Sequence, residues 1–214
     1  MSSDWDDSGY DDYLADQGAE MLYQEHRAQA IEEFTIERLQ SFYNAHPDLA
    51  GPALRALAEA RRLSSLHPES ALVFAAIAME LGIKTVLLKP VVHGLVHQES
   101  TAALITDMVL SYTAFQKYRG LLFQILSDHG GIDLRIYRRP GSSIDIWAEV
   151  SQVLALRNAI VHRGETVDVR SVDLAVATAS TVMEVLIPEV LRHIGLHLHD
   201  GRTICGDALC RVSA

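Results

Sequence analysis

Four long segments carry apolar residues at helical spacing and are bounded by Pro or Gly, and this pattern restricts the fold more than any other feature. They run from Ala71 to about Leu88, from Thr101 to Leu126, from Ser143 to Arg163 and from Asp168 to about Leu198. We expect Pro90 to end the first helix, Ser142 or Ser143 to cap the third and Gly164 to end it. Pro188 should kink the last helix or start a new segment. The alternation at 134–138 is too short to make a sheet, so the sequence predicts an all-α protein.

These segments and the charge distribution predict the organisation of the chain. Residues 67–198 should form a bundle of four to five core helices, preceded by a helical extension over 19–66 with helices at 19–43 and 53–63. The tail, residues 199–214, reads as irregular. Residues 1–18 read as a disordered arm, since the first 20 residues hold seven acids and no Lys or Arg. One hypothesis is that this arm imitates phosphate and covers a basic surface of the nearly neutral body.

The sequence also bears on the compartment. Cys205 and Cys210 are the only cysteines, so there is no disulfide framework. No basic region followed by an apolar stretch opens the chain, so we expect no signal peptide. The longest apolar runs contain Glu80 or Glu184 and read as too short to span a membrane. We therefore predict a soluble cytoplasmic protein without a membrane partner.

One helical segment, Asp145 to His162, carries residues suited to chemistry. On a helical wheel Arg157 falls among the apolar residues, where a charge needs a partner or a purpose. Asn158 and His162 are four residues apart, so they share the opposite, small-residue side. His162 also lies at the C-terminal end of the helix, where the helix dipole favours the imidazolium form.

Together these three side chains suit cleavage of an RNA phosphodiester. His162 would move the proton, Arg157 would hold the negative charge that develops on phosphate, and Asn158 would orient either group. The nucleophile would be the 2′-OH of the substrate, so the products would be a 2′,3′-cyclic phosphate and a 5′-OH. The residues require neither a metal nor a cofactor for this chemistry, and we predict none.

The segment Arg157-Asn158-Ala159-Ile160-Val161-His162 resembles the R-N-x-x-x-H motif of HEPN domains. Ala-Met-Glu-Leu at 78–81 is similar to the HEPN helix that carries an acidic residue, and the likeness spans roughly residues 69–198. The resemblance implies a homodimer whose two motifs form a composite site, and metal-independent RNA cleavage in toxin–antitoxin, phage-defence or stress settings, with an antitoxin or regulator as a further partner. Gly164 stands where some HEPN toxins carry a tyrosine, which disfavours that subgroup.

Other residues could support such a site. Glu80 is predicted either to pair with Arg157 and fix its pose, or to pair with Lys84 on the same helix. Five residues flank the motif helix and could line an RNA groove: Arg135, Tyr137, Arg138, Arg139 and Arg163. Tyr137 could stack on a base, while the alternative for each arginine is a solvated loop position.

Histidines and cysteines outside the motif are candidate metal ligands. His93 and His97 have the spacing of a helical metal pair, and His197, His199, Cys205 and Cys210 could complete a zinc site. Neither CxxC nor HExxH is present, so the preferred interpretation is surface histidines and free thiols.

Three functions compete. The first is a HEPN endoribonuclease, and the second is a catalytically inactive HEPN scaffold or nucleotide-binding dimerisation module. The third, a helical DNA-binding regulator, is disfavoured because the body is not basic and shows no convincing helix-turn-helix.

Overall fold

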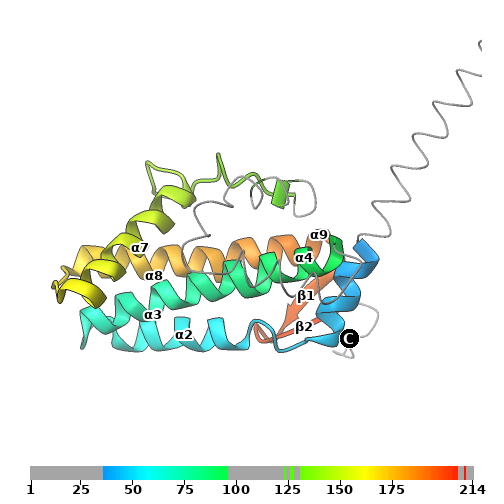
Figure 1. The fold of residues 1–214 in the computed structure, drawn as a ribbon, viewed down its shortest axis with the longest axis horizontal. Coiled ribbons are helices and arrows are strands. Elements are labelled where there is room, and N and C mark those ends of the chain that lie inside the picture. The colour runs from blue at the N-terminus through cyan, green and yellow to red at the C-terminus, as the bar shows by residue number, and fades with distance from the viewer. Residues whose placement is uncertain (1–35, 96–122, 124–125, 128–130, 207–209, 211–214) are drawn as a thin grey trace, which may run out of the picture. The chain divides into compact units, whose positions relative to one another are not determined.

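The computed structural model of this chain describes residues 36–95, 123, 126–127, 131–206 and 210. Within these ranges the protein is helical apart from one short hairpin, which confirms the predicted all-α class. Figure 1 shows α2 (Gly51–Leu63), α3 (Pro68–Leu81) and α8 (Val169–Thr181) side by side, with α7 (Ile146–Arg163) crossing α3 and α8 at an angle. Residues 36–45 form a further helix. The helix predicted at 101–126 lies almost wholly outside the described residues.

The first core helix continues beyond Pro90, contrary to our prediction. Helix α3 passes into the π-helical segment η1 (Gly82–Leu88) and then into α4 (Lys89–Leu95). In η1 the Lys89 N–H donates to Lys84 O, five residues back, so the turn is wider than an α-turn. A wider turn immediately before Pro90 accommodates a residue that cannot donate a backbone hydrogen bond.

Tyr43 supplies a donor next to that proline. Pro90 has no N–H for the carbonyl groups one turn before it, and the Tyr43 hydroxyl donates to one of them, Val86 O, at 2.7 Å. The Tyr43 side chain is only 2% exposed, so its hydroxyl depends on this acceptor. The contact joins helix 36–45 to η1, and burial raises the pKa of Tyr43 above its usual range.

The last long helix has the same construction. Helix α8 passes into the π-helical segment η2 (Val182–Leu186) and then into α9 (Ile187–His193), and Pro188 lies in the first turn of α9. This agrees with the prediction that Pro188 would start a new segment. The two composite helices pack together at Gly82, where a Cβ atom would lie 2.6 Å from Met183 Sδ and 3.2 Å from Ile187 Cδ1.

The residues after α9 form a hairpin, which corrects two predictions. Strands β1 (Leu196–His199) and β2 (Thr203–Gly206) pair antiparallel. Residues 199–206 are therefore not an irregular tail, and the chain contains strands that we did not predict. Asp200 and Gly201 both have positive φ, as a type I′ turn requires, and Arg202 N–H donates to His199 O at 2.9 Å. Figure 1 shows the hairpin near α4 and α9, while the C-terminal end of α7 lies at the opposite end of α8.

The described part of the predicted extension packs against the predicted bundle. Helix α2 packs extensively against α3 and also against α8. The physical reason is that α2 buries its apolar face, including Leu57 and Leu63, in the same core. The acidic arm predicted at 1–18 and the helix expected from 19 to 35 lie outside the described residues.

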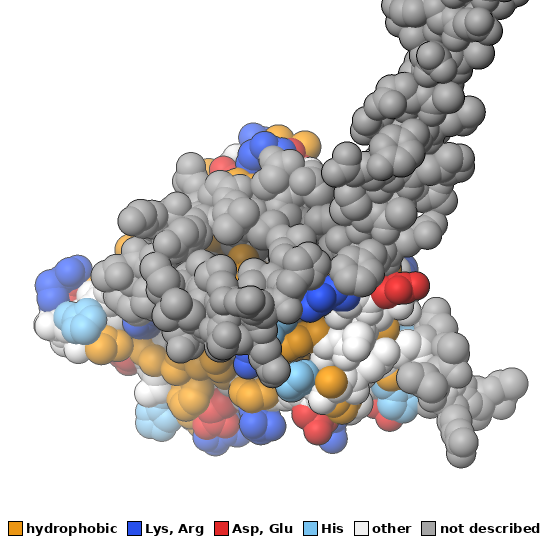
Figure 2. Space-filling view, turned by 45° about the vertical axis from the view of Figure 1, so that its right-hand side comes forward, with side chains coloured by type: hydrophobic (Ala, Val, Ile, Leu, Met, Phe, Trp, Pro, Cys, Tyr) orange, Lys and Arg blue, Asp and Glu red, His pale blue; other side chains and the backbone are white. Residues whose placement is uncertain are grey.

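In the part of the chain that the structure describes, two helices are long and apolar enough to cross a membrane: Pro68–His93 and Val169–His193. Our expectation that the apolar runs are too short was therefore wrong on length. Their most apolar windows are 61% and 56% buried inside the protein, as in the core helices of many folds without a membrane. Figure 2 shows acidic and basic side chains interspersed over the described part of the face it displays.

We predict that Tyr43→Phe lowers the free energy of unfolding by about 1–2 kcal/mol, because the buried Val86 carbonyl loses its donor. Urea denaturation followed by circular dichroism measures the change. The partly exposed Tyr137→Phe is the control and should leave stability nearly unchanged.

The same tyrosine predicts a pH dependence. Because its pKa is higher in the folded protein than in the unfolded chain, the folded state retains the proton and stability should fall as pH rises above about 10. The fall should be smaller in Tyr43→Phe. An identical alkaline profile for the two proteins would contradict this role.

Candidate functional site

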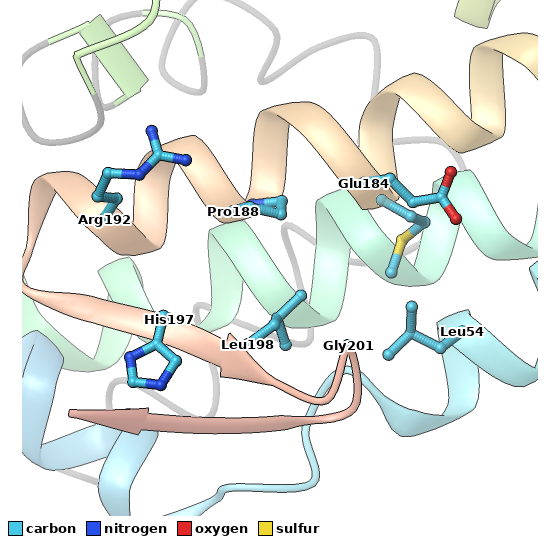
Figure 3. A pocket seen from close by; sticks show the side chains of 8 residues that line it. Leu54, Glu184, Pro188, Arg192, His197, Leu198 and Gly201 are labelled. Atoms are coloured by element: carbon cyan, nitrogen blue, oxygen red, sulfur yellow. The ribbon is translucent and has the colours of Figure 1, made fainter. Parts of the chain in front are cut away.

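The cavity that Figure 3 shows is not at the predicted motif. It has a volume of about 320 Å³ and is lined by Leu54, Met183, Glu184, Pro188, Arg192, His197, Leu198 and Gly201. The two charged side chains in its wall form ion pairs within the protein: Glu184 pairs with Arg61 at 2.5 Å, and Arg192 pairs with Glu189. None of the motif residues lines this cavity, so the candidate site is the exposed end of α7.

Local interactions fix both ends of α7. The Asp145 carboxylate caps the first turn by accepting from Ala148 N–H at 2.8 Å. The cap was predicted at Ser142 or Ser143, but the Ser142 hydroxyl is bonded to Ile144 in the preceding loop instead. Gly164 ends the helix in the left-handed conformation (φ 65°), as predicted, and its N–H donates to the last turn. His162 therefore lies in the final turn of a fixed helix.

Arg157 is held by the core helix beneath it. Its Nη2 lies 2.8 Å from Glu80 Oε2 of α3, and the two side chains are 13% and 19% exposed. Glu80 Oε1 also lies 3.7 Å from Lys84 Nζ, so both predicted pairings of Glu80 exist together. Two cations therefore share one carboxylate. We predicted Lys84 only as a structural partner of Glu80, yet it also places a positive charge beside the motif.

The other motif side chains lie toward solvent. Asn158 is partly buried and makes an interaction of its own, whereas His162 and Val161 are exposed, Val161 by 55%. The small-residue side of α7 is open as well, since Gln152 and Ala155 are exposed. The arrangement presents an imidazole at a helix C-terminus, one turn beyond an arginine that is anchored to the core.

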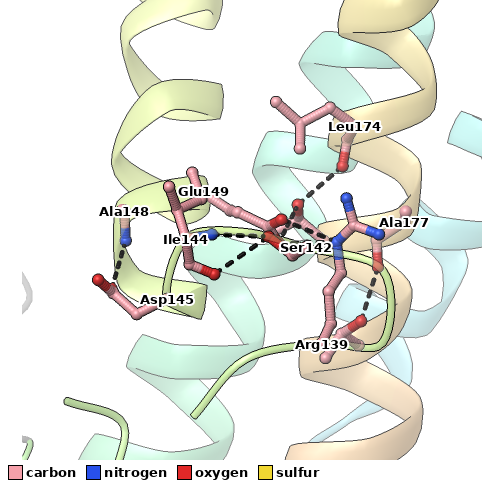
Figure 4. Close-up of polar contacts among 10 residues, drawn as sticks. Arg139, Ser142, Ile144, Asp145, Ala148, Glu149, Leu174 and Ala177 are labelled. Carbon is pink, nitrogen blue, oxygen red and sulfur yellow. Dashed lines mark hydrogen bonds and ion pairs between the residues drawn. The ribbon is translucent and has the colours of Figure 1, made fainter. Parts of the chain in front are cut away.

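Arg139 has a structural partner that sequence reasoning missed. Figure 4 shows its guanidinium against Glu149 of α7, with Arg139 Nε 2.9 and 2.8 Å from the two carboxylate oxygens. Glu149 is 1% exposed and also accepts from the Thr178 hydroxyl of α8 at 3.3 Å. Arg139 therefore has a structural role, because a buried carboxylate requires its counter-ion. Its contact with RNA stays a prediction. The signal for the structural role was one acid, Glu149, on an otherwise apolar side of the helix.

The other residues predicted to contact RNA are nearer to solvent. Arg138 is exposed and Tyr137 is partly exposed in the loop before α7. Arg135 pairs with Asp133 at 2.8 Å, and hydrogen bonds from the Arg135 side chain and backbone lower the pKa of Asp133. Arg163 hydrogen-bonds Glu165, and this bond raises the pKa of the Arg163 guanidinium. Both arginines are available at the surface but already share their charge with acids.

The histidines and cysteines set aside as metal ligands fall into two groups. The His93 ring packs on Phe42 with centroids 4.9 Å apart, and His97 lies outside the described residues. His197, His199, Cys205 and Cys210 gather at the hairpin, with ligand atoms all within 4.8 Å of one another. Both cysteines are free thiols, as we interpreted them, but the two histidines are partly buried and do not lie on the open surface. The hairpin explains this correction, since our prediction had no strand to align them.

Comparison with known proteins gives no relative: no protein-family model, curated protein or solved structure matches this chain.

We predict that Arg139→Ala lowers the free energy of unfolding by about 3 kcal/mol, because it leaves Glu149 buried without a counter-ion. The neighbouring Arg138→Ala should change stability by less than about 0.5 kcal/mol. Thermal and urea denaturation of the two variants compare them directly. Equal stability of Arg139→Ala and the wild type would contradict the structural role.

Proposed function

We propose that this protein is a HEPN-type endoribonuclease whose catalytic residues are Arg157, Asn158 and His162. The observation that carries the proposal is the combination of an arginine anchored on the core helix by Glu80 and an exposed histidine in the last turn of the same helix. Anchoring matters because electrostatic stabilisation of a developing charge requires a group that is already in position.

Each residue would have one role. His162 takes the proton from the 2′-OH or gives one to the 5′-oxygen that leaves, and its exposure lets an RNA strand reach it. Arg157, with Lys84 near its carboxylate partner, attracts the phosphate to this end of α7. Asn158 shares the face of His162 and would orient the phosphate or the imidazole. Arg138 and Tyr137 would extend the contact along the strand.

A second copy of the chain would complete the site. The exposed motif end includes apolar Val161, and Val169 at the start of α8 is 67% exposed. In the proposed dimer the two motifs face each other and share one phosphate between them. Cytoplasmic action in toxin–antitoxin, phage-defence or stress response, with an antitoxin or regulator, belongs to the same proposal.

One observation favours the alternative, an inactive HEPN scaffold or nucleotide-binding dimerisation module. Glu80 already neutralises Arg157 within the protein, so the arginine is accounted for without any substrate. In that case the same pairing serves only to hold α7 on α3. The two functions differ in whether His162 is required for cleavage.

We predict that His162→Ala reduces RNA cleavage by about two to four orders of magnitude, the usual contribution of a general acid or base. Purified full-length protein is incubated with a mixed RNA pool without added divalent cation, and the product ends are identified by mass spectrometry. Wild-type protein should leave 2′,3′-cyclic phosphates and 5′-OH ends. His193→Ala, which removes an exposed histidine at the end of α9, is the matched control and should cleave normally.

The competing outcomes are distinct. Equal cleavage by the wild type and His162→Ala would overturn the assignment of the histidine. Binding of RNA or nucleotide with no cleavage by the wild-type dimer would favour the scaffold.

A further inference from the structure

Four side chains near the C-terminus form a cluster with the composition of a metal site. His197 Nε2 lies 3.1 Å from Cys210 Sγ and 3.2 Å from Cys205 Sγ, and His199 Nδ1 lies 3.4 Å from Cys210 Sγ. Both cysteines are free thiols, and all four residues are partly buried. Two thiols and two imidazoles so close together offer four ligand atoms to one ion.

The hairpin explains why these residues meet. His197 and His199 alternate along β1 and so point to one face, and His197 pairs directly with Cys205 in β2. Leu198 and Ile204, the pair between them, take the other face, where Ile204 is 1% exposed. The Cys210 N–H donates to Gly206 O at 3.0 Å, which holds Cys210 close to the end of β2. The polar face of the hairpin is thus lined with ligand residues while its apolar face joins the core.

The distances fit a tetrahedral ion. Zinc binds imidazole nitrogen at about 2.0–2.1 Å and thiolate sulfur at about 2.3 Å, so tetrahedral ligand atoms are separated by roughly 3.3–3.8 Å. The three shortest separations, 3.1, 3.2 and 3.4 Å, need to open by a few tenths of an ångström, while the widest, which lie within 4.8 Å, need to shorten. Asp200 Oδ2 lies 3.2 Å from His199 Nε2, which leaves His199 Nδ1 for the ion, the usual carboxylate–histidine arrangement behind a zinc ligand.

The ligand set also selects the metal and its role. Two thiolates with two imidazoles in tetrahedral geometry suit zinc, whereas magnesium and calcium prefer oxygen ligands. Because the protein supplies all four ligands, no position remains for water or substrate, which is typical of a structural site.

An ion at this position would stabilise the hairpin. A two-stranded hairpin is barely stable by itself, and this one is joined to the bundle through Ile204 N–H, which donates to Pro47 O at 2.8 Å, and through packing on α9. An ion held by both strands and by Cys210 would fasten the hairpin and keep Pro47 in place. Figure 3 shows that His197 also borders the cavity, so the same ion would stiffen one of its walls.

We propose that His197, His199, Cys205 and Cys210 bind one zinc ion as a structural site that fastens the C-terminal hairpin to the helical bundle. The site is independent of the proposed nuclease centre, which lies at the other end of α8 (Figure 1).

The test uses the full-length protein. We expect about one zinc per chain by mass spectrometry of the metal content, and a Cys210→Ser variant that binds zinc at least tenfold more weakly. Replacement by Co²⁺ should produce the visible absorption of a tetrahedral thiolate complex in the wild type. His193→Ala is the control and should retain the full metal content.

Removal of zinc from the wild type by chelation should lower its melting temperature, and this test does not rely on a variant that folds. In Cys210→Ser, the same chelator should leave the melting temperature unchanged. A native protein that contains no zinc and takes up no Co²⁺, or one in which Cys205 and Cys210 form a disulfide, would overturn the proposal. RNA cleavage is not the readout, so failure here would leave the nuclease proposal untouched.

Discussion

The close packing of two composite helices is the interaction on which the rest of the structure depends. The helix that begins with α3 and the helix that begins with α8 each contain a π-helical segment before a proline, and they approach each other at Gly82. The absence of a side chain at Gly82 leaves room for Met183 and Ile187. Helix α7 packs over one end of this pair and the hairpin follows the other end. The two proposed sites thus lie on the same pair of helices but at opposite ends of it.

Much of the helical core could be predicted because burial leaves a periodic trace in the sequence. The apolar segments, the end of α7 at Gly164 and the new segment at Pro188 follow from local chemistry. The passage through Pro90 could not be predicted, because it depends on a π-turn and on Tyr43, 43 residues away from its acceptor. The hairpin was missed although its signal was present: Asp200-Gly201 between an alternating segment and a short strand is a strong turn pattern.

In the candidate site, too, some contacts could be predicted from the sequence and others could not. The pairing of Glu80 with Arg157 could be anticipated, because a charge among apolar residues demands a partner and Glu80 is a rare acid in an apolar helix. The partner of Arg139 could not, because an arginine-rich loop looks the same in the sequence whether it binds RNA or a buried Glu149. The proposed zinc ligands lack the usual CxxC spacing, and the register of β1 and β2 brings three of them, His197, His199 and Cys205, together.

The central claim is that the end of α7 promotes attack by the 2′-OH of RNA on the adjacent phosphate. It is tested most directly with two RNA oligonucleotides of one cleavable sequence, one of them carrying a single 2′-O-methyl group on the nucleotide 5′ to the mapped cleavage position. The account predicts that the methyl group abolishes cleavage at that position and spares other positions, because the nucleophile is removed there alone. Undiminished cleavage at the methylated position would contradict it, since the attacking oxygen would then come from elsewhere.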